Sequence, residues 1–539
     1  MMKKTVVAWL VVLACAGGPL WGGGVEEQSA AGDGAETTAH VGYFFKDYGR
    51  YPLDPEKHIV FRELGKKFNI EWDLSSAPGS EYDSKLSVIL ASGDIPDIML
   101  LVNQGNSRVA QWGDVDGYFL DLGPHLAKMP HLLSNFLSVI PDGIKNSMTD
   151  TGAIYSTGNY KTSTADNFSQ GFSYRKDVFD KHGMTPGNTF DAFYENLKEL
   201  KTLYSDTSPF SVPGGSDWLI TYSSPLFETG IGFGGKPVLP TGVYYDFWGT
   251  PPSYAEGGTD ENYRTMLEFL HRLYAEGLLH PEFSATGSAT YQKLIVNNQI
   301  FMGMNRSWNT PDTVTRAGRK ENDNPDFTWM WAEFPSYDGA GKTYTFGGVS
   351  SGAQRVVSAT TKHLDRILKV FDYMFTEEYV ELFAYGVEGE TFNYDDRGQP
   401  QYSDQVKTTD LQWAVGLNAG GEVRGGDFPG QQERGAREAA RQQLAFYDDV
   451  GAGLPAEPYL TFTEEEGDEL RELDALNTYL SEMAYKFIIG EESFANWDSY
   501  VARCKELGIE RKVAIYNQAF ARYQGRAALA TDLLSSLGY

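Results

Sequence analysis

The stretch KLSVILASGDIPDIML (residues 85–100) carries the pattern from which the fold of this chain is predicted. Its first half places Leu86, Ile89 and Leu90 on one face of a helix, and Gly93 ends that helix. Its second half opens an apolar run that continues to Val102, which is typical of a strand buried on both faces. A helix followed by such a strand predicts an α/β fold with a parallel sheet.

Two aspartates, Asp94 and Asp97, lie on either side of Pro96 in this stretch. They are either a pair of working carboxylates or the joint between the helix and the strand. Proline restricts the backbone at such a joint, and short aspartates suit it because their side chains hydrogen-bond nearby backbone groups. We therefore interpret Asp97 as the residue that opens the strand, and we do not expect an acid pair.

Strand and helix also alternate in the segments before this stretch, and helices dominate the end of the chain. The pattern predicts strands at 37–45, 69–74 and 98–102 and helices at 54–68, 82–91, 190–204 and 261–279. Residues 208–258 are rich in Gly, Pro and Trp and are expected to form loops. Thr463 and Glu466 match a capping box, which predicts the start of a long helix.

The size and charge of the chain exclude several classes of protein. A length of 539 residues suggests two or more domains. The formal net charge of −28 argues against binding to nucleic acids and against adsorption to anionic membrane surfaces, because both draw on Lys and Arg. Cys504 recurs with Trp497, Tyr500 and Val501 at helical spacing, so we expect a core residue there and not a nucleophile.

The first residues have the features of an export signal. Lys3 and Lys4 precede an apolar run that is too short to span a bilayer, and Cys15 closes that run. The sequence around Cys15 resembles a bacterial lipobox, although Val12 stands where leucine is usual. Residues 16–37 are poor in large apolar side chains and are expected to form a flexible tether. The prediction is a membrane-anchored lipoprotein that faces the periplasm or the cell exterior; the alternative is secretion with cleavage near residues 22–24.

Two short motifs resemble catalytic or cofactor sites but lack the context that their chemistry needs. GVSSG (348–352) fits the nucleophile elbow of α/β-hydrolases, yet a strand-like segment follows where a helix is required. GIGFGG (230–235) fits a dinucleotide fingerprint, yet the two prolines of KPVLP oppose the helix that must come next. The sequence shows no zinc motif and no EF-hand loop, so we expect neither a cofactor nor a metal.

Four stretches, taken in their order, resemble one family. They are KLSVILASGDIPDIML (85–100), YRKDVFDKHGMTPGNTFDAFYENLKELK (174–201), YGVEGETF (385–392) and FIIGEESFANWDSYVARCKELGIERKVAIYNQAFARY (487–523). Together they are similar to the extracellular solute-binding proteins of family 1, the substrate-binding lipoproteins of ABC transporters, and above all to the branch of the alginate oligosaccharide-binding proteins.

The resemblance implies two α/β lobes, each a mostly parallel sheet flanked by helices, with a helical C-terminal region. Mapped by segment order, lobe one comprises residues 38–158 plus 336–395, and lobe two comprises residues 159–335 plus 396–539. The lobes of such a protein close on an oligosaccharide, and the closed monomer docks on membrane permease subunits. That cycle breaks no bond, so the resemblance does not imply an enzyme.

One departure concerns calcium. The alginate-binding relatives carry a calcium loop after the helix that corresponds to residues 190–204. Here that place reads SDTSPFSVPGG, in which Asp206 is the single acid. Calcium takes six to eight oxygen ligands, so the resemblance does not carry a calcium site over to this chain.

The candidate ligand-binding residues lie near the expected lobe crossings and inter-lobe loops. Aromatic side chains cover the apolar face of a sugar ring, and charged or amide groups bind its hydroxyls. The candidates are Trp308, Tyr385, Glu388, Asp47, Tyr48, Trp112, Tyr160 and Arg175. Two roles stay open for Arg175, which pairs either with a ligand carboxylate or with Asp177 or another acid of the fold.

The expected ligand is a neutral or mildly acidic oligosaccharide, because the negative charge of the chain would slow the approach of a long polyanion. Two other classes stay open. One is a secreted polysaccharide-active enzyme of the glycoside hydrolase type, since the two carboxylates of such an enzyme can lie far apart in sequence. The other is a surface lipoprotein that binds a ligand other than a sugar.

Overall fold

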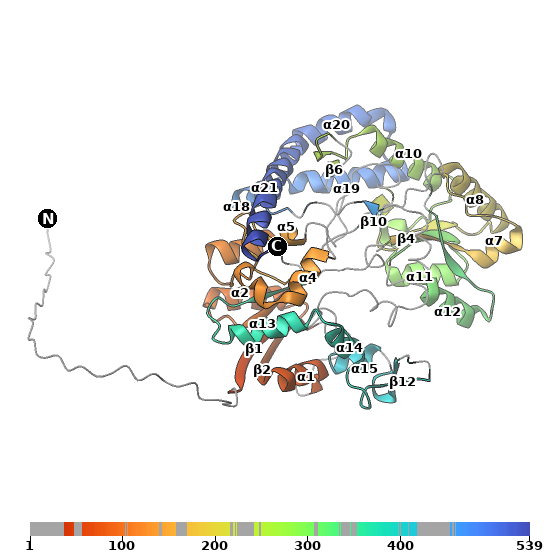
Figure 1. Cartoon of the computed structure of the whole chain (residues 1–539). Helices are drawn as coiled ribbons and strands as arrows, with labels where there is room; N and C mark the ends of the chain where they lie inside the picture. The colour runs from red at the N-terminus through yellow and green to blue at the C-terminus, as the bar shows by residue number, and fades with distance from the viewer. Residues whose placement is uncertain are drawn as a thin grey trace, which may run out of the picture. The chain divides into compact units, whose positions relative to one another are not determined.

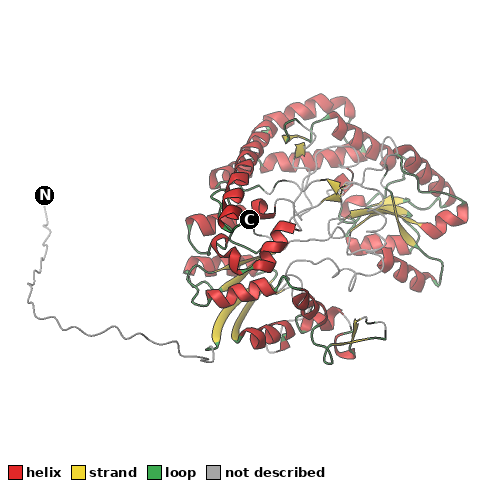
Figure 2. Cartoon of the chain, in the orientation of Figure 1, coloured by secondary structure: helices red, strands yellow, loops and turns green. Residues whose placement is uncertain are grey.

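The chain contains two four-stranded sheets, each with its own hydrophobic core (Figures 1 and 2). A computed structural model describes residues 37–47, 57–102, 104, 106–138, 143–157, 170–215, 219–220, 223, 242–246, 250–306, 311–333, 335, 345–346, 353–396, 398, 400–407, 409–417, 453–454, 458 and 460–539. The α/β fold predicted from the sequence is confirmed.

The first sheet has the strand order β11-β3-β1-β2. Its strands are β1 (Ala39–Asp47), β2 (Ile70–Pro78), β3 (Ile98–Val102) and β11 (Ala353–Val357). Strand β1 pairs in parallel with β2 and β3, whereas β11 pairs with β3 in the antiparallel direction. The helices around this sheet include α1 (Ile59–Phe68), α2 (Tyr82–Ser92), α4 (Pro130–Ser138), α13 (Leu364–Tyr373) and α14 (Glu377–Tyr385).

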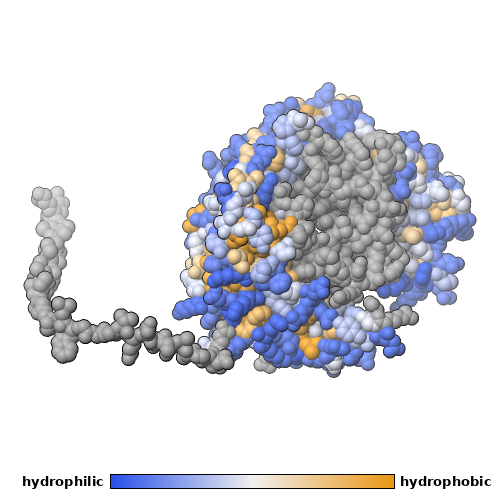
Figure 3. Space-filling model, in the orientation of Figure 1, coloured by the Kyte–Doolittle hydropathy of each residue, from blue (hydrophilic) through white to orange (hydrophobic). Residues whose placement is uncertain are grey.

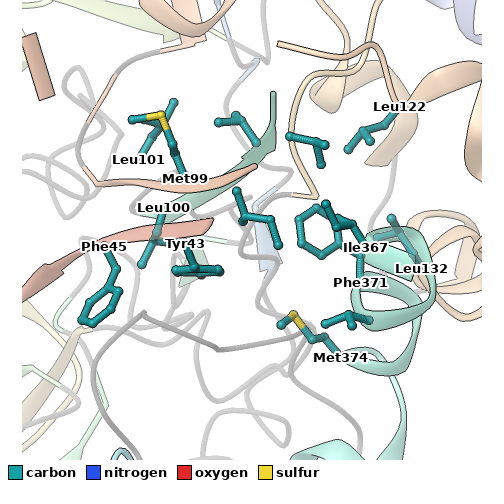
Figure 4. Close-up of a cluster of buried hydrophobic side chains, with 14 of the residues drawn as sticks. Tyr43, Phe45, Met99, Leu100, Leu101, Leu122, Leu132, Ile367, Phe371 and Met374 are labelled. Atoms are coloured by element: carbon teal, nitrogen blue, oxygen red, sulfur yellow. The ribbon is translucent and has the colours of Figure 1, made fainter. Parts of the chain in front are cut away.

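Every residue of β3 is buried, as its uninterrupted apolar run predicts. Figure 4 shows Leu100 on the side of Tyr43 and Phe45, with Met99 and Leu101 on the opposite side of the strand. Helices therefore cover both faces of the sheet. Burial on this scale makes the transfer of apolar surface from water the main term that stabilises the lobe.

Asp97 joins three segments of the first sheet. Its carboxylate accepts hydrogen bonds from the backbone N–H of Gly42 at 3.0 Å and from the hydroxyl of Thr361 at 2.5 Å. Its backbone oxygen also accepts from the N–H of Ser358 at 2.9 Å. Asp94 is exposed, and its backbone N–H bonds to Ser92. The prediction of a structural joint is confirmed.

The second sheet has the strand order β5-β8-β4-β9. Its strands are β4 (Gln170–Arg175), β5 (Phe210–Ser211), β8 (Met302–Arg306) and β9 (Trp329–Ala332). Its helices are α7 (Lys176–His182), α8 (Phe190–Leu203), α10 (Glu261–Ala275), α11 (Ser288–Val296) and α12 (Pro311–Asn322). Strand β5 pairs in parallel with β8, but β4 pairs in the antiparallel direction with both of its neighbours.

The prediction of a mostly parallel sheet is therefore wrong for the second sheet, and the reason lies in how the chain enters it. Gln170, the first residue of β4, lies opposite Arg306, the last residue of β8. In the first sheet, Ala353 at the start of β11 likewise lies opposite Val102 at the end of β3. A strand that enters a sheet at the carboxyl ends of its neighbours must run against them. Strand β4 lies between β8 and β9, so it makes two antiparallel pairings.

The chain also has short helices, helical turns and short strands outside the two main sheets. In chain order they are α3 (Asn106–Ala110), the π-helical turn η2 (Gln111–Val115), η3 (Gly123–Lys128), α5 (Gly143–Ser147), β6 (Val243–Asp246), β7 (Ser253–Glu256), η5 (Phe283–Ala285), β10 (Thr345–Phe346), β12 (Phe392–Tyr394), β13 (Pro400–Tyr402), η6 (Asp404–Val406), α15 (Thr409–Ala414) and β14 (Gly453–Leu454). Strands β5, β6 and β7 thus lie in the segment that the sequence assigned to loops.

Helices form the C-terminal region, as predicted. They are α18 (Glu464–Glu472), α19 (Asp474–Ile489), η7 (Phe494–Asn496), α20 (Trp497–Glu506) and α21 (Ile509–Ser536). The capping box between Thr463 and Glu466 is present. The helix that it opens is short, however, because the backbone leaves the helical conformation at Leu473 before α19 begins. Cys504 is fully buried, and burial raises the pKa of its thiol to about 11, as befits a core residue.

Helix α21 contacts both hydrophobic cores. Ile509, near its start, belongs to the core of the second sheet, whereas Ala530 belongs to the core of the first. Val406 and Leu417 also pack in the first core, although the boundary predicted from the sequence assigns them to lobe two. The exact lobe boundaries stay a prediction.

The surface of the described residues is largely polar. The face in Figure 3 is mostly blue, with orange patches among the hydrophilic residues. The exposed large apolar side chains come from many different elements and include Val88, Val115 and Leu203. Among the described residues, none of the helices is both long and apolar enough to cross a membrane.

Candidate functional site

The carboxyl ends of the parallel strands in the first sheet lie along one edge. Strand β1 ends at Asp47 opposite Pro78 of β2, and β3 ends at Val102 opposite the start of β11. In open α/β sheets this edge carries the ligand-binding loops, because the strands deliver successive loops to one place. Several polar side chains lie at this edge of the first sheet.

Four residues form a connected group here, which we call the sheet-edge cluster: Gln104, Arg108, Ser156 and Gln354. The Gln354 amide donates to the Gln104 backbone oxygen at 3.1 Å, and the Ser156 hydroxyl donates to the Gln354 side-chain oxygen at 3.3 Å. Arg108 donates to the Gln104 side-chain oxygen at 2.9 Å. The cluster therefore ties β3 and β11 to the segment that leaves the first sheet near Ser156.

The hydrogen-bonding groups of the sheet-edge cluster differ in their exposure to solvent. Gln104 and Gln354 are buried, at 4% and 2% exposure, whereas the side chain of Arg108 is exposed. Asp83 accepts a further bond from the Gln104 amide at 2.8 Å and so fixes its orientation. The exposed guanidinium of Arg108 is suited to binding sugar hydroxyls, and the two buried amides of the cluster fix its position.

Sequence reasoning missed the sheet-edge cluster. A signal was present, because Asn103 and Gln104 follow the apolar run of β3 directly. The candidates named from the sequence include Asp47 at the end of β1 but neither Asn103 nor Gln104 at the end of β3. Gln354 has no such signal, since nothing in the sequence shows that β11 lies beside β3.

Two of the predicted residues lie at the end of β1 or just after α3. Asp47 is the last residue of β1 and is half-buried. Trp112 lies in the π-helical turn η2, is half-buried, and meets Phe119 edge to face with ring centroids 6.3 Å apart. The Trp112 ring thus keeps part of its surface open, as a stacking residue requires.

The turn η2 packs on Tyr155, a residue of the segment that leaves the first sheet. A Cβ at Gly113 would lie 2.4 Å from the Tyr155 ring, so only glycine permits this approach. The Tyr155 hydroxyl donates to Asp114 at 2.8 Å. Burial and the charge of Asp114 raise the pKa of Tyr155 well above its usual value, so the hydroxyl stays a donor.

Tyr385 and Glu388 lie at the end of α14 and in the turn that follows it. Tyr385 is 8% exposed and packs on Phe392 and Tyr402, with ring centroids 5.6 and 5.3 Å away. Glu388 is exposed and bridges to Phe392 through the backbone. The structure therefore leaves the carboxylate of Glu388 open to solvent and encloses most of the Tyr385 ring.

Arg175 takes the second of its two expected roles. Its guanidinium donates two hydrogen bonds to Asp177, at 2.9 and 2.8 Å, and a third to Asn298 at 2.6 Å. It also lies over the Phe327 ring, 3.7 Å from the centroid, and is only 2% exposed. The fold itself occupies this arginine, which corrects its assignment to the ligand.

The other predicted positions fall outside the described residues. They are Tyr48, Tyr160, Trp308 and the lipidation candidate Cys15, together with the motifs GVSSG and GIGFGG. Strand β11 does follow GVSSG, as the strand-like pattern predicts. Within the described part of the chain, the acids, histidines and cysteines form no group of three that could hold a metal ion.

Comparison with known proteins identifies relatives of the whole chain. The family model described as "Bacterial extracellular solute-binding protein" matches residues 55–381. The polygalacturonan/rhamnogalacturonan-binding protein YtcQ of Bacillus subtilis (strain 168) is 24% identical over 536 residues, which cover 96% of this chain and 99% of the relative. Lipoprotein LipO of the same organism is 24% identical over 352 residues, which cover 64% of each chain.

A solved structure shows the same fold. The crystal structure of the alginate-binding protein AlgQ2 without calcium ion superimposes with a TM-score of 0.65 over 90% of this chain and 99% of that one, at 17% sequence identity. The two-lobed fold that the sequence motifs indicated is confirmed.

Proposed function

The chain belongs to the family of bacterial extracellular solute-binding proteins, and from this premise we propose that it captures an oligosaccharide and delivers it to the permease of an ABC importer. The observation that carries the proposal is the family match, extended over almost the whole chain by a relative named as a polysaccharide-binding protein. The sheet-edge cluster supports it with groups suited to sugar hydroxyls.

We propose that the ligand lies against the sheet edge of lobe one. Arg108, held in place by Gln104 and Gln354, binds hydroxyl groups, and Trp112 stacks on a sugar ring. The remaining predicted contacts are Asp47, Tyr48, Tyr160, Trp308, Tyr385 and Glu388. Closure of lobe two over this edge is favoured only as far as the ligand binds the closed state more tightly than the open one.

We further propose that the exported monomer is held at the membrane by lipid on Cys15. The export signal in the sequence supports this, as does the relative named as a lipoprotein. Residues 16–37 then act as the tether between the membrane and the folded part.

Thermal unfolding across a panel of oligosaccharides, followed by mass spectrometry of each sugar, tests the function. A binding protein unfolds at a higher temperature with its ligand and returns that ligand intact. Release of shorter products would instead establish the glycoside hydrolase alternative. No shift with any glycan would favour the surface lipoprotein with a different ligand.

Two variants make the test specific. We expect Gln354→Ala and Trp112→Ala to weaken sugar binding at least tenfold. Leu203 is an exposed residue at the end of α8, so Leu203→Ala should leave binding unchanged.

Labelling with a radioactive fatty acid tests the proposed lipid anchor at Cys15. Incorporation is expected in the full chain and not in Cys15→Ala, and absence of label in the unaltered chain would refute lipidation.

A further inference from the structure

Arg355 lies in the middle of β11 with its side chain in the first core. It is 1% exposed and lies opposite Leu100 of β3 in the antiparallel ladder. Directly opposed residues of such a ladder point to the same face of the sheet. Arg355 therefore points to the face that Leu100 shares with Tyr43 and Phe45 (Figure 4).

The guanidinium of Arg355 is unpaired. All three of its nitrogens are buried, and none has a hydrogen-bond partner in the described part of the chain. A buried charge without a partner is costly, so buried arginines are normally paired. Arg175 and Arg526, the other two buried arginines among the described residues, bond to Asp177 and Asp150 respectively.

The unpaired polar atoms in this core are hydrogen-bond donors. The Tyr379 hydroxyl is buried and has no partner, and the charge of Arg355 acts on it. In the ring of His58, Nδ1 accepts from the Phe61 backbone N–H at 3.4 Å, which places the proton on Nε2. That Nε2 is also buried and unpaired.

What the described part of this core lacks is an anionic acceptor. A guanidinium presents five N–H donors in a planar fork that matches the two oxygens of a carboxylate. Among the described residues no carboxylate pairs with Arg355, which leaves its fork free for a ligand. We propose that Arg355, with the Tyr379 hydroxyl of the same core, forms a buried anion site that takes one carboxylate-sized oxyanion.

Two sources supply such an anion. One is a free carboxylate of the medium, and the other is a uronic acid residue of the bound oligosaccharide, an assignment that rests on the proposed function. The position of Arg355 is compatible with the second source. Strand β11 starts at the sheet edge, Arg355 is its third residue, and the Arg355 backbone oxygen accepts from the N–H of Thr157 in the crossing segment.

The experiment has two arms on the full chain. In the first, acetate is titrated at constant ionic strength and the unfolding temperature is recorded. We expect a saturable rise for the unaltered chain and none for Arg355→Met. In the second, calorimetry compares oligogalacturonate with its methyl ester, which keeps the rings and hydroxyls but lacks the charge. If the ligand supplies the anion, Arg355→Met weakens binding of the acid about 10- to 100-fold and leaves the ester unchanged.

Further variants separate charge, geometry and folding. Arg355→Lys keeps the charge but not the fork, and Tyr379→Phe removes one donor, so each weakens the response several-fold. Arg366→Met is the matched control, because Arg366 on α13 donates to a backbone oxygen at the surface and retains the full response. Should Arg355→Met not fold, Arg355→Lys and Tyr379→Phe still decide the question.

The outcomes are distinct. Loss of the acetate response alone identifies a free anion as the occupant, and loss of the preference for the acid over the ester identifies the ligand. If Arg355→Met behaves as the unaltered chain in both arms, the anion site does not exist. If the unaltered chain binds no oligosaccharide, the proposed function fails, while the acetate arm still tests the site.

Discussion

Two fully buried arginines in this protein have opposite surroundings. Arg526, on α21, is 0% exposed and donates twice to one oxygen of Asp150, at 2.8 and 2.7 Å. Arg522 bonds to the other oxygen of Asp150 and also to Glu466. Arg355, on β11, has the same burial and no partner among the described residues.

The charge of Arg526 is paired within the fold, whereas the charge of Arg355 has no partner among the described residues. Burial opposes the ionisation of Asp150, but the charge of Arg526 and the bonds from both arginines outweigh it and lower the pKa of Asp150. The network joins the turn that follows α5, the start of α18 and helix α21, which contacts both cores. Asp150 pairs with both arginines of this network, whereas no described residue pairs with Arg355.

The largest effect is expected from Asp150→Asn, which removes the negative charge that pairs with Arg526. Removing one partner of a buried ion pair strands the other charge, so the free energy of unfolding should fall by about 3–5 kcal/mol. Chemical denaturation measures this loss. The control is Asp365→Asn, which breaks an exposed pair with Lys128 and should have little effect. Equal losses in both variants would show that burial of the charge is not the cause.

The second prediction removes the unpaired charge. In buffer without carboxylates, Arg355→Met should raise the free energy of unfolding by about 1–3 kcal/mol, because methionine fills the space without a charge to desolvate. Thermal and chemical unfolding check this gain. A loss as large as that of Asp150→Asn would mean that the protein itself supplies a partner for Arg355.

The third prediction concerns His58, another unpaired donor of the same core. Burial lowers the pKa of His58 from 6.5 to about 3, so between these values the unfolded chain binds a proton that the folded chain does not. The free energy of unfolding must therefore fall as the pH falls through this window, by about 1.4 kcal/mol per pH unit from this group.

His58→Asn isolates that contribution. Asparagine can cap α1 as His58 does but does not titrate. Unfolding measured at several pH values between 6.5 and 4 should therefore show a slope that is smaller by one proton in the variant. Identical slopes would place the acid sensitivity at another group, and not at Asp150, because its lowered pKa takes effect only below the ordinary carboxyl value of 3.8.

The smallest effect is expected at the surface. Arg62 donates two bonds to Glu390, at 3.0 and 2.6 Å, but the two side chains are 37% and 43% exposed. A double-mutant cycle of Arg62→Met and Glu390→Gln should give a coupling of about 0.2–1 kcal/mol that shrinks with added salt. A coupling that salt does not change would contradict the screening by solvent ions that is expected for an exposed ion pair.

Local patterns in the chain predicted local structure well. The apolar run at 98–102 is β3, the capping box opens α18, and Cys504 lies in the core. Each of these depends on spacing over a few residues, which the chain carries wherever it folds. The family followed from the order of four such stretches.

The site could be predicted only in part. Asp47 is a candidate because a parallel strand ends there, and Trp112 because it is an aromatic residue in a turn after β3; the structure leaves both half-buried. Gln354 and Arg355 could not be found, because their surroundings depend on β11 entering the sheet beside β3 some 250 residues away in sequence. Arg175 shows the converse, since its nearest acid in sequence is its partner in the fold.

The sequence by itself determined the α/β class, the principal strands and helices, the helical C-terminus and the family, because periodicity, caps and motif order are properties of neighbouring residues. Only the tertiary structure decided the antiparallel direction of β4, the joining of both cores by α21, and which buried arginine has a partner. Each of these depends on segments that meet only after folding, where burial gives a charge or a strand direction its energetic consequence.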